Sequence, residues 1–483
     1  MLVHLTALNP RPDAPAFIFK GQIISYGRFA ELIRVTRNYL YSRGVRPGDR
    51  VGLLCRNSPD FVVCYYAIVS LQAVVVPFNP ALTVREISYM VEDSRMKILL
   101  TQAQMELGDS LTQLLIPETI AAAEAKPAEA APVDQSFDQN HECVIIYTSG
   151  TTGFPKGAVL THRNLISNAQ AIGEAIDMTA KDISFAALPM FHSYAWTVCV
   201  VAPLLSRHAV VVLEAFSPKD AIALIRDSRC TIVNGVPAMY NLYMNFATPE
   251  DFKDVRVFVS GGASLPLEVL KKFEAKTGRA IVEGYGLSEA SPVVSLNPMN
   301  KCKPGSIGLA IPGVMVRVLD DQGIDVKPMV NGELCVNGPN VMKGYFNRPE
   351  DTAKAIVDGW LHTGDVAYRD ADGYLYIVDR LKDMIIVGGL NVYPREVEEV
   401  IYQFPGIKEA AVVGISDRSH GETVHAFVVW AEGAEQQPKH LSDFLRTNLA
   451  SYKQPKEIIA LPVLPRNAGG KVLKKDLRES LKK

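Results

Sequence analysis

The most informative stretch of the sequence is Tyr147-Thr-Ser-Gly-Thr-Thr-Gly-Phe-Pro-Lys-Gly157. The apolar run Cys143–Ile146 precedes it and is typical of a buried strand. Glycines let neighbouring backbone N–H groups point toward one centre, and such a nest binds anions. The hydroxyl groups and Lys156 add donors and positive charge. The stretch therefore predicts a polyphosphate-binding loop, with a plain surface turn as the alternative. Its spacing does not fit the Walker motif.

Outside this loop, the sequence predicts an α/β fold. Apolar runs at 49–55, 73–77 and 97–101 alternate with helical segments, which is typical of a parallel sheet. Short strands and glycine turns predict a β-rich subdomain at 303–378. The Ala-, Pro- and Glu-rich segment 117–135 is interpreted as a mobile connection, with a short helix as the alternative.

The length of the chain, 483 residues, predicts more than one domain. We expect a large N-terminal domain, 1–379, with parallel-type sheets, helices and the β-rich subdomain. A small mobile α+β domain, 380–483, should follow, because an amphipathic helix begins at Pro394 between short strands.

Composition excludes several classes of protein. The net charge of −2 gives no basic excess for nucleic-acid binding. Every long apolar run is interrupted and the N-terminus lacks signal-peptide features, so no transmembrane segment is expected, although peripheral membrane contact stays open. The seven cysteines form no close metal-ligand pairs in the sequence. We interpret them as reduced residues of a cytoplasmic protein.

Polar residues follow several further predicted strands, where ligands bind in open α/β sheets. Glu289 follows the run Ala280–Gly286 and offers oxygen ligands suited to Mg²⁺. Asp365, in a glycine turn, offers two acceptor oxygens. A helix-start acid and a turn former are the plain alternatives.

Five strings resemble, in order, those of the adenylate-forming superfamily, which includes acyl-CoA synthetases, aryl-CoA ligases and luciferases. They are 147–157, 259–266, 284–289, 360–365 with 379–389, and 465–471. The resemblance covers nearly the whole chain. It implies an AMP-binding enzyme that uses ATP and Mg²⁺ to convert a carboxylate into an acyl-adenylate. Coenzyme A then forms the thioester and releases AMP.

The resemblance also implies roles for individual residues. The implied catalytic residues are Thr148, Lys156, Glu289 and Lys471, with Glu289 also a Mg²⁺ ligand and Lys471 on a C-terminal loop. Lys382 is the expected hinge between the domains. The implied nucleotide and CoA contacts are Ser149, Gly150, Thr151, Thr152, Gly153, Gly262, Ala263, Gly284, Tyr285, Gly286, Ser288, Asp365, Arg380, Lys382, Gly388 and Gly389. The family usually has threonine where this chain has Ser288, and the hydroxyl is retained.

The implied acyl pocket contains His192, Trp196, Asn234, Gly235 and Met239, for which a packed core is the alternative. The strings 74–80, 235–240 and 382–398 look most like fatty-acid–CoA ligases, so the resemblance implies a medium- or long-chain fatty acid and a role in lipid metabolism. Aryl- and succinylbenzoate-CoA ligases share close variants. An adenylating enzyme that loads a carrier protein and a non-catalytic nucleotide-binding regulator also stay open. We expect a monomer or homodimer.

Overall fold

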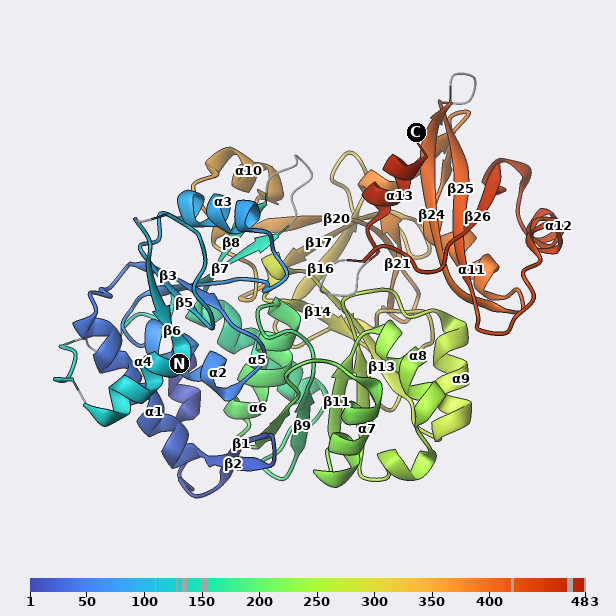
Figure 1. Cartoon of the computed structure of the whole chain (residues 1–483). Coiled ribbons are helices and arrows are strands. Elements are labelled where there is room, and N and C mark those ends of the chain that lie inside the picture. The colour runs from blue at the N-terminus through green and yellow to red at the C-terminus, as the bar shows by residue number, and fades with distance from the viewer. Residues whose placement is uncertain are drawn as a thin grey trace.

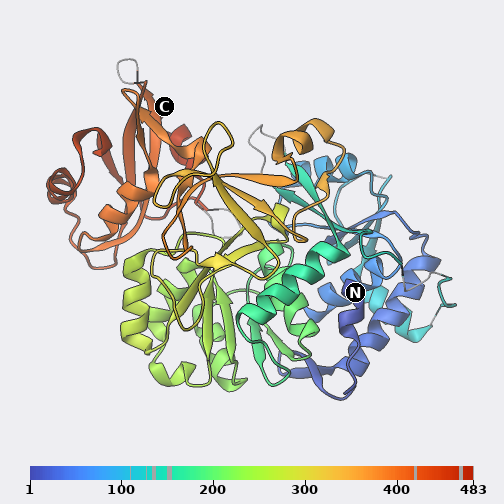
Figure 2. The ribbon, with the colours of Figure 1, turned by 180° about the vertical axis from the view of Figure 1, so that it is seen from behind.

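The computed structural model describes residues 1–108, 110–126, 128–132, 137–148, 155–417, 421–466 and 472–481. Figure 1 shows a large N-terminal domain built from two sheets, their helices and a strand-rich layer, with a smaller C-terminal domain at one side. In the view from behind, helix α5 (His162–Ala175) crosses the middle of the large domain (Figure 2). The mixed α/β class predicted from the sequence is confirmed.

The first sheet has a parallel centre and antiparallel edges. Helices α7 (Pro218–Asp227), α8 (Pro237–Phe246) and α9 (Leu267–Thr277) connect its central strands. The strand order is β15 (Leu309–Ala310), β14 (Val293–Leu296), β13 (Ile281–Gly286), β12 (Val257–Ser260), β11 (Ile232–Gly235), β9 (Ile183–Ala186), β10 (Ala209–Val212), β1 (Pro15–Phe19) and β2 (Gln22–Ser25).

The second sheet contains the strands on either side of the predicted phosphate-binding loop, 147–157. Its order is β18 (Gly344–Tyr345), β8 (Lys156–Thr161), β7 (Glu142–Thr148), β4 (Val74–Pro77), β3 (Arg50–Leu54), β5 (Ile98–Thr101) and β6 (Thr112–Leu115). Strands β7 and β8 are antiparallel neighbours, so the predicted phosphate loop connects two strands of one sheet. Helix α5 begins only after β8.

Local sequence signals account for the helices of this half. Ser58 caps α2 (Pro59–Val69) by accepting from Phe61 N, and Thr83 with Glu86 forms a capping box on α3 (Val84–Ser94). The large domain also contains helix α1 (Tyr26–Ser42) and a π-helix, Ala195–Val201. The π-helix continues directly into α6 (Ala202–Leu205). One apolar core joins residues of both sheets with α2, α5 and the π-helix.

The first part of the segment 117–135 differs from its predicted mobile state. Helix α4 (Ile116–Ala125) occupies its first half, so the short helix that the sequence left as an alternative is the correct interpretation there. Pro117 stands at the helix start, where its missing N–H costs nothing, and alanines favour the helical backbone. Ile120 and Ala123 are buried and anchor the helix to the core.

The predicted β-rich region forms a separate layer and leads into the C-terminal domain. Its strands are β16 (Met315–Leu319), β17 (Gly332–Asn337), β19 (Ile356–Val357), β20 (Trp360–Arg369) and β21 (Leu375–Arg380), with α10 (Pro349–Ala355) beside them. The last sheet contains β22 (Ile385–Val387), β23 (Leu390–Val392), β24 (Ile407–Asp417), β25 (Gly421–Trp430) and β26 (Glu457–Ala460). Its helices are α11 (Pro394–Tyr402), α12 (Pro438–Asn448) and α13 (Lys474–Ser480). Apolar clusters cover both faces of this sheet.

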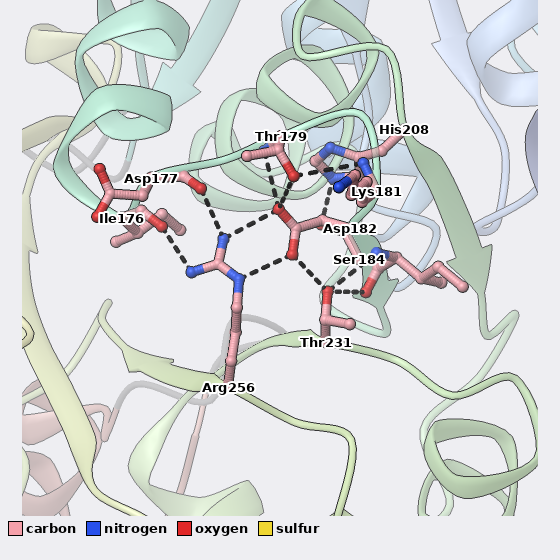
Figure 3. A network of polar contacts seen from close by, with 10 residues as sticks. Ile176, Asp177, Thr179, Lys181, Asp182, Ser184, His208, Thr231 and Arg256 are labelled. Atoms are coloured by element: carbon pink, nitrogen blue, oxygen red, sulfur yellow. Dashed lines mark hydrogen bonds and ion pairs between the residues drawn. The ribbon is translucent and has the colours of Figure 1, made fainter.

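A polar network ties the amino ends of the first sheet's parallel strands (Figure 3). Arg256 Nε lies 2.7 Å from Asp182 Oδ1, and the Thr231 hydroxyl donates to the same oxygen at 2.8 Å. These three residues directly precede β12, β9 and β11. Burial opposes ionisation of Asp182, but its hydrogen bonds from Arg256, Thr179 and Thr231 prevail and lower its pKa to about 2. The opposite, carboxyl ends of the strands stay available for a ligand.

Candidate active site

The Glu289 carboxylate connects the two sheets of the large domain through hydrogen bonds. Glu289 follows β13, in the short turn Ser288–Ala290. Its Oε1 accepts from the Tyr345 hydroxyl at 3.0 Å and from the Thr148 hydroxyl at 3.4 Å, and both donors belong to the second sheet. Burial, with the Glu289 charge as the next cause, raises the pKa of the Tyr345 phenol. Two hydroxyl groups and one carboxylate from separate stretches of the chain thus converge on one point.

Lys156 lies beside this group of oxygens. Its Nζ is 2.8 Å from Asp351 Oδ1 and 5.6 Å from the centre of the Tyr345 ring. The bond from Lys156 lowers the pKa of Asp351. The ammonium is therefore held at the site by a carboxylate that an incoming polyphosphate would have to compete with. The sequence analysis singled out neither Tyr345 nor Asp351, because a single tyrosine and a helix-start acid carry no local signal.

Asp365 lies on β20, opposite Arg380 on β21. It is buried, and its two oxygens have different partners: the Tyr285 hydroxyl at 2.5 Å and Arg380 Nε at 3.1 Å. Three predicted nucleotide contacts, Tyr285, Asp365 and Arg380, therefore come together from three strands. Burial, reinforced by Asp365, raises the pKa of Tyr285 well above its ordinary value.

The glycines at the end of β13 have a packing requirement of their own. A Cβ at Gly286 would lie 2.0 Å from Pro292 O, and one at Gly284 would lie 3.0 Å from Ser295 O. Strand β14 pairs with β13 here and leaves no room for a side chain.

Two further predicted contacts follow neighbouring strands. Gly262 has a φ of +77°, which favours glycine, and Ala263 follows it after β12. The Ser288 hydroxyl lies 3.1 Å from that of Ser193.

The predicted acyl-pocket residues separate into three environments. His192 is exposed, and its Nδ1 accepts from Tyr194 N. Trp196 is buried, with its ring 3.8 Å from the Tyr65 ring, so it packs in the core. Asn234, Gly235 and Met239 are buried at the end of β11 and the start of α8.

Tyr194 covers the carboxyl ends of β11 and β12. Its hydroxyl donates to Val259 O at 3.2 Å, and a Cβ added at Gly261 would lie 3.2 Å from its ring. Neither polar atom of the fully buried Asn234 side chain makes a hydrogen bond within normal limits, although the Cys199 thiol lies beside it. No local sequence signal assigns Tyr194 to this place.

The remaining predicted residues lie at the start of the C-terminal domain or outside the described ranges. Lys382 is in the turn Leu381–Asp383, where burial and then Arg380 lower its pKa. Gly388 and Gly389, both with positive φ, connect β22 to β23. Outside the described residues lie Ser149, Gly150, Thr151, Thr152, Gly153 and Lys471.

This fold and site define an ATP-using enzyme built from two domains, and comparisons with known proteins give the family. The model of the AMP-binding enzyme family matches residues 6–346, and that of the AMP-binding enzyme C-terminal domain matches residues 396–471. The chain belongs to the AMP-binding enzyme family, as the sequence analysis predicted.

Two curated relatives are similar over almost their whole length. A feruloyl-CoA synthase from Amycolatopsis sp is 38% identical, with 97% of this chain and 96% of that protein covered. A long-chain-fatty-acid–CoA ligase from Bacillus subtilis (strain 168) is 34% identical, with 97% and 92% covered.

Among solved structures, ATP-bound MatB from Rhodopseudomonas palustris superposes with a TM-score of 0.93 at 34% identity, covering 100% of this chain and 99% of that one. The apo form of MatB gives a TM-score of 0.82. The described arrangement is thus more similar to the ATP-bound form.

Proposed function

We propose that the protein is an AMP-forming acid–CoA ligase that acts on compact, largely apolar carboxylic acids, with ATP, Mg²⁺ and CoA as its co-substrates. In the first step a carboxylate oxygen bonds to the α-phosphorus and pyrophosphate leaves. In the second step the CoA sulfur bonds to the acyl carbon, the thiol loses its proton and AMP leaves. The observation that carries the proposal is the convergence of the Thr148 and Tyr345 hydroxyls on Glu289, with the Lys156 ammonium beside the Tyr345 ring.

Each part of this site meets one requirement of the first step. Charge stabilisation and positioning dominate phosphoryl-group chemistry. Glu289, with the Thr148 hydroxyl, would hold Mg²⁺, which when bound neutralises phosphate charge. Lys156 would exchange its Asp351 partner for the phosphates. Asp365 would hold the ribose hydroxyls beside Tyr285 and Arg380. The predicted nucleotide-binding roles of 149–153 rest on the sequence alone.

The second step would require the small domain to move. We place the boundary near Lys382, because η5 (Leu381–Asp383) separates the last strand of the large domain from the C-terminal sheet. Rotation there would withdraw Lys471 from the acyl-adenylate and bring Gly388 and Gly389 toward the CoA thiol. The greater similarity to ATP-bound MatB than to the apo form supports an arrangement suited to the first step.

The residues near the end of β11 bear on which carboxylic acid is the substrate. Tyr194 closes the carboxyl ends of β11 and β12, which favours a compact acyl group over a long one. The buried Asn234 amide has only the Cys199 thiol, a weak hydrogen-bonding partner, beside it, so a ligand that pairs with the amide would offset the cost of its burial. A substituted aromatic acid of the feruloyl type would supply oxygen partners, and the feruloyl-CoA synthase relative supports it. A medium- or long-chain fatty acid, predicted from the sequence, is the second candidate and is supported by the fatty-acid ligase relative.

A panel of acids tests this proposal directly. Pyrophosphate release and CoA consumption would be measured for hydroxycinnamic acids, their unsubstituted analogues and straight-chain acids of graded length. We expect CoA-dependent turnover with compact acids, and a preference for oxygen-substituted rings that Asn234→Leu removes. Turnover that rises with aliphatic length would support the fatty-acid alternative instead. Pyrophosphate release without CoA consumption would point to a carrier protein, and ATP binding without any release would point to a non-catalytic regulator.

A further inference from the structure

Three side chains of different chemistry meet on one face of the β-rich layer, outside the nucleotide site described above. Glu333 and Cys335 are two residues apart on β17 and therefore project to the same face. His362 on β20 is the direct cross-strand neighbour of Cys335. One ligand atom from each of the three side chains lies within 4.8 Å of the other two. Sequence reasoning missed this cluster because the cysteine and the histidine are distant in the chain.

The pairwise contacts bring these atoms close to the spacing found around one ion. Glu333 Oε2 is 2.7 Å from His362 Nδ1, and Cys335 Sγ is 3.5 Å from the same nitrogen. Cys335 is fully buried, whereas the side chains of Glu333 and His362 are 22% and 29% exposed, so an ion can enter from solvent. Arg317, opposite Cys335 on β16, is ion-paired with Asp325, which offsets its charge.

We propose that Glu333, Cys335 and His362 form a binding site for a borderline-soft divalent cation of the Zn²⁺ type, separate from the Mg²⁺ site at Glu289. A thiolate, an imidazole nitrogen and a carboxylate oxygen are a ligand set that Zn²⁺ prefers, with solvent as the fourth ligand. Mg²⁺ selects oxygen ligands and would not compete for the sulfur. On binding, the Cys335 thiol transfers its proton to water and the sulfur bonds to the ion.

The cluster also contacts the irregular part of β20 that carries Asp365. Glu333 Oε1 accepts from Gly364 N at 3.0 Å, so the carboxylate can keep this bond while its other oxygen binds the ion. Thr363, next to Gly364 on β20, donates to Leu334 O at 2.6 Å. These bonds hold Glu333 in place before the ion arrives, which reduces the cost of ordering the site.

Cobalt is the most direct probe, because a thiolate bound to Co²⁺ gives an intense near-ultraviolet charge-transfer band. The full chain, without an affinity tag, would be stripped with a chelator under reducing conditions and titrated with Co²⁺ alone. We expect a saturable band that one equivalent of Zn²⁺ removes and that excess Mg²⁺ leaves unchanged. Zn²⁺ should also raise the midpoint of thermal unfolding, since an ion that binds the native state stabilises it.

Variants assign the band to the cluster. Cys335→Ser should abolish the band. His362→Gln should weaken Co²⁺ binding at least tenfold, and this substitution disturbs folding less because His362 is partly exposed. Cys302→Ser is the control, because Cys302 is the more exposed thiol and lies outside the cluster, and the band of this variant should equal that of the wild type. A missing band in the wild type, or a band that survives both Cys335→Ser and His362→Gln, would overturn the proposal. The three residues would then serve only to hold the Gly364 turn.

Discussion

At the scale of the residue, Glu289 has the most demanding position in the candidate site. Its carboxylate accepts from Thr148 and Tyr345, and in the proposed function it also holds Mg²⁺. An amide in the same place would keep the size of the side chain but lose the negative charge, so the two properties can be separated experimentally.

We expect Glu289→Gln to lower the rate of pyrophosphate release by about 100-fold or more, because charge stabilisation at a phosphoryl group is lost. The dependence of the rate on Mg²⁺ concentration should shift to higher concentrations, and thermal unfolding should change little. Tyr345→Phe, which removes a hydrogen bond to the same oxygen but leaves the carboxylate charge in place, is the control and should have a smaller effect. Equal rates for Glu289→Gln and the wild type would contradict the assignment.

Asp182 gives a second prediction, of stability instead of activity. Its pKa is about 2 in the folded protein and 3.8 in its ordinary state. A lowered carboxyl pKa stabilises the fold fully above the unfolded value, and this contribution disappears as the pH falls through the folded value. The difference between the two pKa values corresponds to about 2 kcal/mol in the free energy of unfolding, and solvent screens little of it because Asp182 is buried.

The free energy of unfolding should therefore decrease between about pH 4 and pH 2 through this residue. Denaturant unfolding of wild type and Asp182→Asn at several pH values would measure it. The variant should be less stable at neutral pH, and its difference from the wild type should narrow toward pH 2. A difference that stays constant with pH would exclude the charged Asp182–Arg256 pair as its source.

At the scale of the element, the tight pairing of β13 with β14 determines where Glu289 sits. Gly286→Ala would place a methyl group against Pro292 O, and we expect a loss of about 2 kcal/mol or more in stability. Activity should also fall, because the Glu289 turn follows directly. Gly173→Ala in α5 is the control: its Cβ would meet nothing closer than 3.5 Å, and the helix should gain about 0.5–1 kcal/mol. Chemical denaturation measures both.

The elements also show what could be predicted from the sequence. Strands followed by glycine and polar residues, such as Ala280–Glu289, were predictable because hydrophobic runs and turn residues are local signals. Tyr345 and Asp351 could not be predicted in this way, since β18 and α10 reach Glu289 and Lys156 only through tertiary packing. Trp196 shows the opposite case. The resemblance placed it in the pocket, while the aromatic side chains of α2 enclose it in the core.

At the scale of the whole molecule, we propose that the small domain takes part differently in the two half-reactions. Arg395 of α11 donates to Ile377 O on β21 at 2.8 Å and so joins the two domains, while Arg478 of α13 pairs at 2.7 Å with Asp383 in the hinge turn Leu381–Asp383. Such exposed or partly exposed pairs are weak individually, which suits a domain that has to move.

We expect Lys471→Ala to abolish formation of the acyl-adenylate while retaining thioester formation from supplied acyl-adenylate and CoA. The lysine should be needed only where negative charge moves between carboxylate and α-phosphate. Lys475→Ala, at an exposed position on α13, is the matched control and should leave both rates unchanged. Equal loss of both half-reactions in Lys471→Ala would exclude this division of roles. Separate assays of pyrophosphate release and CoA consumption distinguish the outcomes.

The positions of the cysteines allow the proposed domain movement to be followed by fluorescence spectroscopy. All seven cysteines lie in the described ranges, unpaired, and all except Cys302 are buried. With Cys302 replaced by serine, a fluorophore pair could be attached selectively to two cysteines introduced on exposed positions, one on α12 and one on α1. Changes in energy transfer on adding ATP, acid and CoA in turn would then follow the rotation in single molecules, without first rebuilding the interior to remove competing thiols.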